Sequence, residues 1–165
     1  MKLTAECFNK VKKECLKFIK SQETKADKFK NKDRMIKSFL IPLCFWISKK
    51  AGKKRPYFIG LAGGQGTGKT TISSLIKIIL TKYFKLKVFK ISIDDFYKTR
   101  KERLSLSKRV HPMLLIRGVP GTHDINMMLS FFRKAKNKKF KRLKLPTFNK
   151  AIDDRSDKKK WYNLK

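Results

Sequence analysis

Eight consecutive residues near the middle of the chain have the types and spacing needed to hold phosphate groups. The run from Gly63 to Thr70 reads G-G-Q-G-T-G-K-T and matches the pattern G-x-x-x-x-G-K-[ST] at every required position. Its glycines let the backbone bend until successive N–H groups point at the phosphates of a nucleotide. Lys69 would add a positive charge, and the Thr70 hydroxyl could ligate Mg²⁺. The residues expected to bind the nucleotide are Gly63, Gly64, Gln65, Gly66, Thr67, Gly68, Lys69, Thr70 and Thr71.

A pair of neighbouring carboxylates follows about 25 residues later, in the segment S-I-D-D-F-Y from Ser92 to Tyr97. If a strand ends here, Asp94 and Asp95 lie near the phosphate loop, because ligands in open α/β sheets bind outside the carboxyl ends of strands. A carboxylate there can take a proton from an attacking hydroxyl or help to hold Mg²⁺. The alternative is that the two acids cap the start of a helix. The scarcity of acids in this chain favours the functional interpretation.

The elements that must position these residues can be predicted from apolar patterning. Residues 57–62 are expected to form a buried strand, and apolar residues recur at helical spacing from Ile72 to Tyr83. Residues 88–93 are expected to form a second strand. The order of strand, loop, helix and strand predicts a right-handed crossover and a parallel sheet. We therefore expect an α/β fold of the P-loop NTPase type, with helices flanking a parallel sheet that is incomplete, because two strands make a thin sheet.

The remaining segments divide the chain into two predicted domains. Residues 1–54 are expected to form an N-terminal helical extension, with a helix over residues 3–20, and residues 55–165 the kinase-like core. The pattern is irregular from residue 96 to Arg117. A helix is expected over residues 124–136 and a short strand, interrupted by Pro146, over residues 143–148. The residues of the later helix expected to face inward are Ile125, Met128, Leu129 and Phe132.

The composition is strongly basic, with 44 Lys and Arg against 12 Asp and Glu and a net charge of +32. Such a charge attracts polyanions without any motif. Lysines outnumber arginines about four to one and are spread over the chain, which also follows from an AT-rich genome. We favour a dispersed, solvated surface with weak non-specific polyanion binding, and nucleic-acid binding remains an alternative.

The cysteines and the apolar segments indicate in which cellular compartment the protein is expected. Cys7, Cys15 and Cys44 form no C-x-x-C pair, so we expect buried core residues in a reducing interior and neither disulfides nor a zinc site. The N-terminus lacks the apolar region of a secretory signal. The longest apolar run, residues 39–47, is too short to span a bilayer. We expect a cytoplasmic protein that has no membrane partner.

Four segments together resemble a known family. The phosphate loop, the S-I-D-D-F-Y segment, the run R-G-V-P-G-T-H-D at 117–124 and the stretch P-T-F-N-K-A-I-D-D-R at 146–155 are similar to the phosphoribulokinase, uridine kinase and pantothenate kinase group. The resemblance is strongest to the D-glycerate 3-kinases and covers about residues 40–161. It implies an ATP-dependent kinase that transfers the γ-phosphate to a hydroxyl of a small acceptor, with D-glycerate as the best candidate.

The same resemblance implies a role for particular residues. Asp94 would be the general base and a Mg²⁺ ligand, and Lys69 would act on the phosphates, with Thr70 on the metal. A guanidinium suits a substrate carboxylate because it can donate two parallel hydrogen bonds. The residues expected on the acceptor side are Asp95, Tyr97, Arg117, His123 and Asp124.

The chain departs from these kinases in two places. Asn149 stands where they usually carry Asp. They also continue into a strand that ends in E-G-W and then into lid and adenine-binding segments, none of which is present here. We therefore expect a truncated or split chain that needs a missing C-terminal half or a partner chain. A catalytically inactive nucleotide-binding fragment is the alternative.

Overall fold

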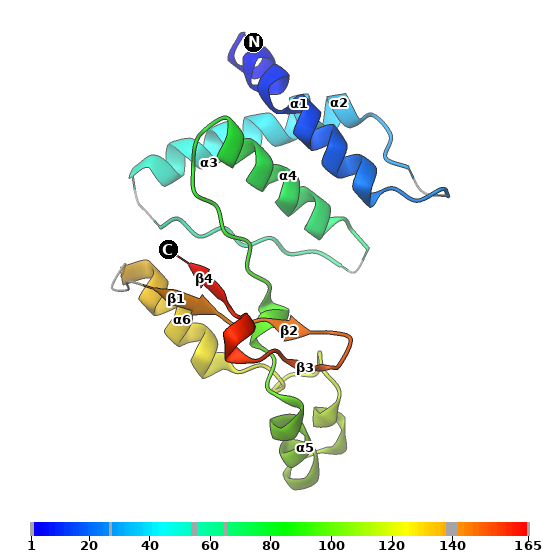
Figure 1. The fold of residues 1–165 in the computed structure, drawn as a ribbon, viewed down its shortest axis with the longest axis vertical. Helices are drawn as coiled ribbons and strands as arrows, with labels where there is room; N and C mark the ends of the chain where they lie inside the picture. Colours follow the sequence, from blue (N-terminus) through cyan, green and yellow to red (C-terminus); the bar gives the residue numbers. More distant parts are fainter. Residues whose placement is uncertain (1, 27, 54–55, 65, 138–141, 165) are drawn as a thin grey trace. The chain divides into compact units, whose positions relative to one another are not determined.

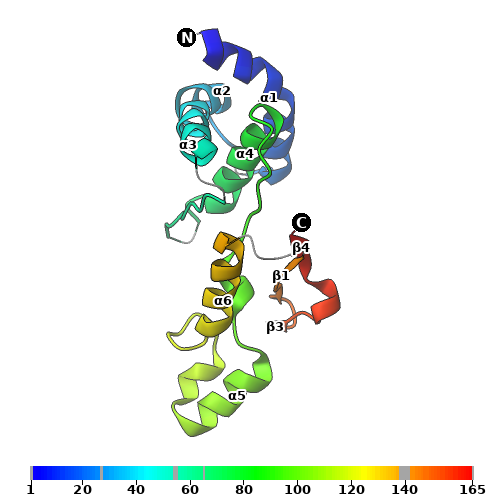
Figure 2. The same cartoon turned by 90° about the vertical axis from the view of Figure 1, so that its left-hand side faces the viewer.

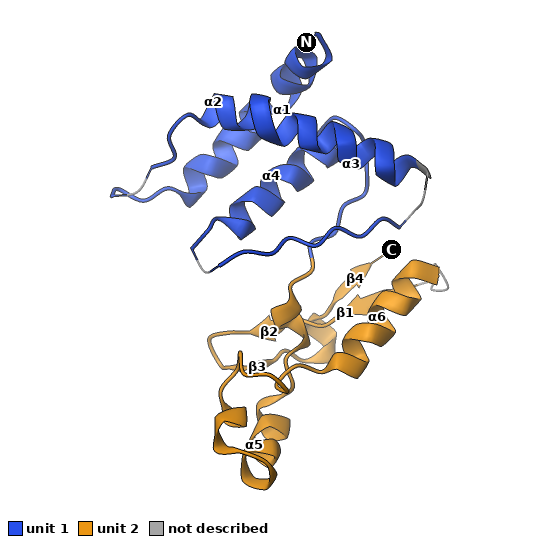
Figure 3. Cartoon of the chain, turned by 180° about the vertical axis from the view of Figure 1, so that it is seen from behind, with its two compact units in different colours: residues 1–90 blue, residues 91–165 orange. Residues whose placement is uncertain are grey.

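The chain divides into two compact units, residues 1–90 and residues 91–165 (Figure 3). The computed structural model describes residues 2–26, 28–53, 56–64, 66–137 and 142–164, with the backbone alone for Lys53. The division falls after the phosphate loop and its helix, so both lie in the first unit with the N-terminal helices. The predicted domain boundary between residues 54 and 55 stays a prediction.

The first unit is a group of helices around one apolar core. Its elements are α1 (Lys2–Gln22), α2 (Lys32–Met35), a π-helical turn (Ile36–Leu40), α3 (Ile41–Lys53) and α4 (Lys69–Lys82). Helix α1 packs against α3 and α4 (Figures 1 and 2). The predicted helix over residues 3–20 and the helix behind the phosphate loop are thus confirmed. The buried core residues are Cys7, Phe8, Val11, Cys15, Ile19, Ile36, Leu40, Ile41, Cys44, Ile47, Leu75, Ile79 and Leu80.

The three cysteines belong to this core, as predicted. Burial raises the thiol pKa of Cys7 to about 11, and that of Cys15 and Cys44 to about 12. All three are free thiols. Burial in the apolar core and a raised pKa are typical of cysteines that serve packing.

The structure does not show the predicted parallel sheet. Residues 57–62 and 88–92 form neither helix nor strand, and the apolar side chains of Phe58, Ile59 and Phe89 are exposed. A parallel sheet is stable when further strands pair with its edges and helices cover both faces. Two segments alone would leave much of their backbone outside any ladder, so apolar patterning did not suffice to form strands here.

The second unit combines short helices with two small antiparallel ladders. Its α-helices are α5 (Arg100–Arg109) and α6 (Ile125–Asn137). It also contains three 3₁₀ turns, at Ile93–Phe96, Pro112–Leu115 and Lys158–Lys160. Strand β1 (Leu143–Leu145) pairs with β4 (Tyr162–Leu164), and β2 (Phe148–Asn149) pairs with β3 (Asp154–Arg155). The core consists of Phe96, Phe131, Leu143, Leu145 and Leu164.

Two details of this unit differ from the prediction. Ile125 and Leu129 of α6 are exposed, and Phe131 is the buried residue of this helix. Residues 96–117 were expected to be irregular, but they contain α5. This helix begins with a capping box, in which the Thr99 hydroxyl accepts from the Glu102 N–H and the Glu102 carboxylate accepts from the Thr99 N–H.

No helix among the described residues combines the length and the apolar character needed to cross a bilayer.

Candidate active site

The phosphate loop has a backbone conformation that depends on its glycines. Gly66 and Gly68 have φ values of 79° and 76°, in the left-handed region where glycine carries no steric penalty. A Cβ on Gly63 would lie 3.0 Å from Oγ1 of Thr67. Helix α4 starts directly after Gly68, which gives its first turn no side-chain cap. The N–H groups of that turn and the positive end of the helix dipole are therefore suited to an anion.

The side chains of the loop differ in what they can do for a ligand. Lys69 Nζ and Thr67 Oγ1 both donate to the Gly64 carbonyl, the latter at 2.9 Å. Thr70 is exposed in the first turn of α4, whereas Thr71 is buried and 9% exposed. Thr70 therefore offers its hydroxyl to a ligand, and the Thr71 side chain contributes to packing. Gln65, also predicted to bind nucleotide, lies outside the described residues.

In the second unit, the two neighbouring aspartates have different environments. Asp95 completes a capping box with Ser92, whose N–H it accepts at 3.2 Å, and its other oxygen accepts from the Phe148 N–H at 3.3 Å. Burial raises the pKa of the Asp95 carboxyl, and these two N–H groups oppose the shift. Asp95 therefore caps the start of a helical turn, which is the alternative role considered for these two acids.

The neighbouring Asp94 directs its carboxylate to a cation instead. Its Oδ2 lies 2.8 Å from Nζ of Lys150, and the two side chains are 37% and 65% exposed. Because an ion pair this exposed is worth about 0–1 kcal/mol, it can be exchanged for a ligand contact at little cost. Asp94 is thus the more exchangeable carboxylate of the pair.

Tyr97 and His123 form one surface next to this turn. Their rings stack with centroids 4.1 Å apart, and their backbones form an antiparallel bridge. Burial lowers the pKa of the His123 imidazole, with Lys98 acting in the same direction and Asp94 opposing it. His123 Nε2 is buried without a hydrogen-bond partner among the described residues. Gly118, with φ 95°, would place a Cβ 3.9 Å from the Tyr97 hydroxyl.

Arg117 and Asp124, the last two predicted acceptor residues, have distinct contacts. Arg117 Nη1 pairs with Asp153 Oδ1 at 3.2 Å, and its guanidinium carbon lies 5.7 Å from the centroid of the Phe148 ring. The Phe148 ring in turn lies 5.2 Å from that of Tyr97. Asp124 Oδ1 caps α6 by accepting from the Met127 N–H at 3.0 Å. Arg117 therefore lies in the same neighbourhood as Tyr97, whereas Asp124 serves the helix start.

Sequence reasoning assigned no role to several residues that build this neighbourhood. Lys150 pairs with Asp94, and Arg155 donates to the Tyr97 carbonyl at 2.6 Å and pairs with Asp124 at 3.4 Å. Both belong to the stretch 146–155 that carried the family resemblance, which was the available signal. The buried Arg103 and the partly exposed Asp153 form an ion pair next to them. Arg103 falls in the segment expected to be irregular, and no motif pointed to it.

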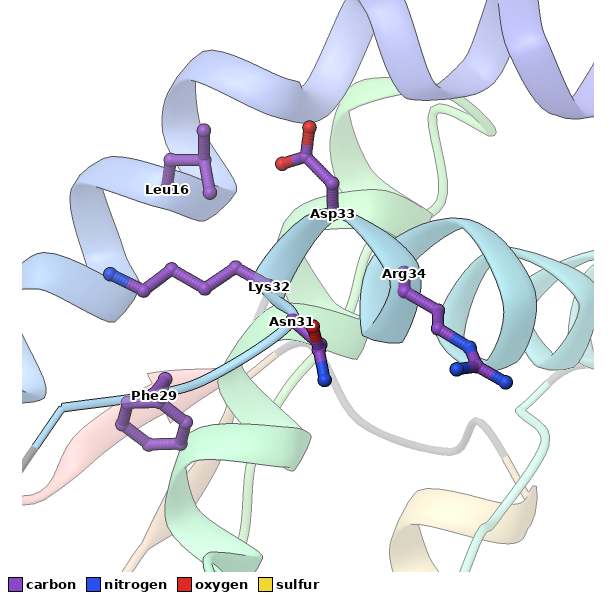
Figure 4. A pocket seen from close by; sticks show the side chains of 6 residues that line it. All are labelled: Leu16, Phe29, Asn31, Lys32, Asp33 and Arg34. Carbon is purple, nitrogen blue, oxygen red and sulfur yellow. The ribbon is translucent and has the colours of Figure 1, made fainter.

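Two surface hollows of the described residues contain none of these side chains. One is a hollow in the first unit, lined by Leu16 of α1, Phe29 and residues 31–34 (Figure 4). Asp33 reaches toward α1 and pairs with Lys12 at 3.0 Å, and Lys32 pairs with Glu23 at 2.7 Å. Two of the three charged groups that line this hollow, Lys32 and Asp33, are thus paired with residues of the same unit.

The same residues include few groups that could bind a metal ion. The described part of the chain contains no group of three or more His, Cys, Asp or Glu side chains that could hold a metal ion. Mg²⁺ does not need such a cage, because it is usually bound through one or two protein oxygens together with substrate phosphates and water. The exposed Thr70 hydroxyl and the Asp94 carboxylate are oxygen donors of the required kind.

Comparisons with known proteins agree with the sequence motifs. The uncharacterized kinase mug58 of Schizosaccharomyces pombe is 34% identical over 116 residues, covering 65% of this chain and 40% of that protein. The chloroplastic D-glycerate 3-kinase of Arabidopsis thaliana is 32% identical over 114 residues, covering 64% and 25%. A pantothenate kinase of Streptococcus suis is 32% identical over 93 residues, covering 54% and 28%. No protein-family model matches the chain.

A solved structure of the YGR205w protein is similar with a TM-score of 0.57 and 30% identity, covering 71% of this chain and 46% of that one. The homologues of the chain are kinases of the uridine, pantothenate and glycerate kinase group, and the resemblance noted in the sequence is confirmed. The chain spans between a quarter and two fifths of the length of the curated relatives described above.

Proposed function

We propose that the chain is part of an ATP-dependent kinase that phosphorylates a hydroxyl of a small acceptor. The observation that carries the proposal is the phosphate loop, with left-handed Gly66 and Gly68 directly before the N-terminus of α4. Kinase homologues that match the chain over 116 and 114 residues support it. The phosphate loop belongs to the first unit, and the residues expected on the acceptor side belong to the second.

The acceptor we propose is a small hydroxy acid, with D-glycerate as the leading candidate. The Lys150 side chain pairs with Asp94. The Arg117 guanidinium lies over the Phe148 ring and donates to the Lys150 carbonyl at 3.4 Å. Cations placed beside a base suit a substrate with a negative charge next to its hydroxyl. Glycerate and pantothenate, the acceptors in the names of two relatives, are both hydroxy carboxylates.

The chain's own residues would divide the work of phosphoryl transfer. Lys69 would leave the Gly64 carbonyl for the phosphates, and the loop N–H groups would surround them. Asp94 would accept the proton of the acceptor hydroxyl once Lys150 has moved to the acceptor's charge. The Thr70 hydroxyl could hold Mg²⁺ that arrives with ATP, and the ion would supply charge neutralisation at the transferring group.

The test measures binding and chemistry separately. Calorimetry should show that Lys69→Ala loses most of the Mg·ATP affinity, with Lys77→Ala, a lysine on the same helix, as the matched control. Coupled ADP release with D-glycerate, glycerol, uridine and pantothenate should identify the acceptor. Asp94→Asn should keep ATP affinity and lose turnover by about 10²–10⁴-fold.

Each outcome separates the possibilities. Equal ATP affinity in wild type and Lys69→Ala would remove the nucleotide site. Intact ATP binding with no phosphorylation of any acceptor would favour the catalytically inactive nucleotide-binding fragment. Full turnover in Asp94→Asn would exclude Asp94 as the base.

A further inference from the structure

One arginine of the second unit is completely buried. The Arg103 side chain is 0% exposed, although it starts from α5, a helix whose other residues are mostly polar. Its Nε donates to the Lys98 carbonyl at 3.3 Å and its Nη1 to the Leu115 carbonyl at 2.7 Å. A guanidinium out of water also needs a negative partner. Asp153 supplies it, with Oδ2 3.0 Å from Nη2 of Arg103.

Asp153 is held in an unusual conformation by this contact. Its φ of 52° lies in the left-handed region, which non-glycine residues seldom adopt. Arg103 Nη2 donates to the Asp153 backbone carbonyl as well as to its carboxylate, so both the backbone and the side chain are fixed. Strained conformations of this kind persist where surrounding contacts over-determine them, and they cluster at functional sites.

The second oxygen of the Asp153 carboxylate contacts Arg117, one of the residues expected on the acceptor side. Asp153 Oδ1 lies 3.2 Å from Nη1 of Arg117. The two guanidinium carbons lie 5.8 Å (Arg103) and 5.7 Å (Arg117) from the centroid of the Phe148 ring. The Arg117 side chain remains 36% exposed, whereas that of Arg103 is closed to solvent. The inner arginine is thus structural, and the outer one is presented to solvent.

We propose that Asp153 is a positioning residue. Locked by Arg103, it holds the Arg117 guanidinium in the orientation in which Arg117 binds the carboxylate of a hydroxy-acid acceptor. This inference rests on the proposed function for the identity of the acceptor. The arrangement of the three side chains does not depend on it.

The variant that tests this role is Asp153→Asn. Asn has nearly the same shape and tolerates a left-handed backbone, so the loop conformation should survive. It removes the negative charge between the two arginines. Asp157→Asn is the matched control, because Asp157 is exposed in the same unit and its side chain caps nothing. Asp153→Asn leaves the buried Arg103 without its counter-charge, so if it fails to fold, Arg103→Met/Asp153→Asn, which removes both charges together, takes its place.

Steady-state kinetics should separate positioning from a general structural effect. In Asp153→Asn we expect KM for D-glycerate to rise about ten-fold, as for loss of a hydrogen bond to a charged group, with kcat and KM for ATP nearly unchanged. Weak turnover of glycerol, which lacks the carboxylate, should not change. An equal fall of kcat with both acceptors and an unchanged KM for glycerate would overturn the proposal.

A second readout does not require turnover. Phenylglyoxal modifies accessible arginines, and mass spectrometry can follow the labelling of Arg117 in the full chain. We expect Arg117 to react several-fold faster in Asp153→Asn than in wild type or Asp157→Asn. An unchanged rate would show that Asp153 does not hold Arg117, even if the kinase reaction is confirmed. A faster rate in a chain that phosphorylates no acceptor would support the positioning role and reject the proposed function.

Discussion

Phe96 anchors the segment that carries Asp94, Asp95 and Tyr97, and its removal should be costly. Its side chain is 0% exposed, and its ring centroid lies 5.6 Å from that of Phe131 and 6.2 Å from that of Phe132. Truncation of a buried Phe to Ala typically costs about 3–5 kcal/mol. A unit of about 75 residues has a folding free energy of roughly 4–11 kcal/mol. Phe96→Ala should therefore remove a large share of the stability of the second unit.

Urea denaturation followed by tryptophan fluorescence measures this loss in the unit concerned. Trp161 lies in the second unit and donates its Nε1–H to the Ser156 carbonyl at 2.8 Å. Trp46 lies in the first unit and is 52% exposed, so a Trp46→Phe background leaves Trp161 as the reporter.

The control and the refuting result follow from exposure. Ile152 belongs to the same unit and is 59% exposed, so Ile152→Ala should change the free energy of unfolding by less than about 0.5 kcal/mol. The reasoning fails if Phe96→Ala costs no more than this control, because the ring would then not anchor the segment.

Two further predictions concern pH and salt. The pKa of His123 is lowered by burial, so the unfolded state binds more protons between that pKa and the unfolded value of about 6.5. The free energy of unfolding of the second unit should therefore fall as pH decreases through this window. In a pH series of urea titrations, His123→Gln should weaken the dependence of the free energy of unfolding on pH. If that dependence is the same in the variant and the wild type, His123 is not its source. The charge of +32 should give RNA binding at low salt that falls steeply with added salt. Filter binding that revealed sequence-selective affinity of about 10⁻⁸ M at physiological salt would instead favour the nucleic-acid alternative.

Features that depend on neighbouring residues could be predicted from the sequence. The phosphate loop is specified by glycine positions, and two of them have a left-handed backbone, which glycine adopts without steric penalty. The helices α1 and α4 follow from apolar residues at helical spacing, because one face of each must be buried. The capping box of α5 is equally local, and reading Thr99 and Glu102 as a helix start would have found that helix.

Features that depend on distant segments could not be predicted in this way. Apolar residues at 57–62 and 88–93 are compatible with buried strands, but a strand forms only when another segment accepts its hydrogen bonds. The short ladders that did form pair residues that are close in the chain, such as Phe148 with Arg155, or that bring distant ends together, such as Leu143 with Leu164. Periodicity in one segment contains no information about which partner it finds.

The two aspartates and the buried arginine show the same limit at the level of single side chains. Asp94 and Asp95 are identical in type and adjacent, and only the positions of Ser92 and Lys150 decide which one orders the turn and which one meets a cation. Arg103 would ordinarily be assigned to the surface, because burying an unpaired guanidinium is unfavourable. Its burial becomes possible because Asp153, 50 residues later, supplies the compensating charge. A residue whose burial requires so specific a partner is a strong candidate for a role in ordering the site. The contact between Arg103 and Asp153, more than any local motif, is therefore our basis for the orientation of Arg117.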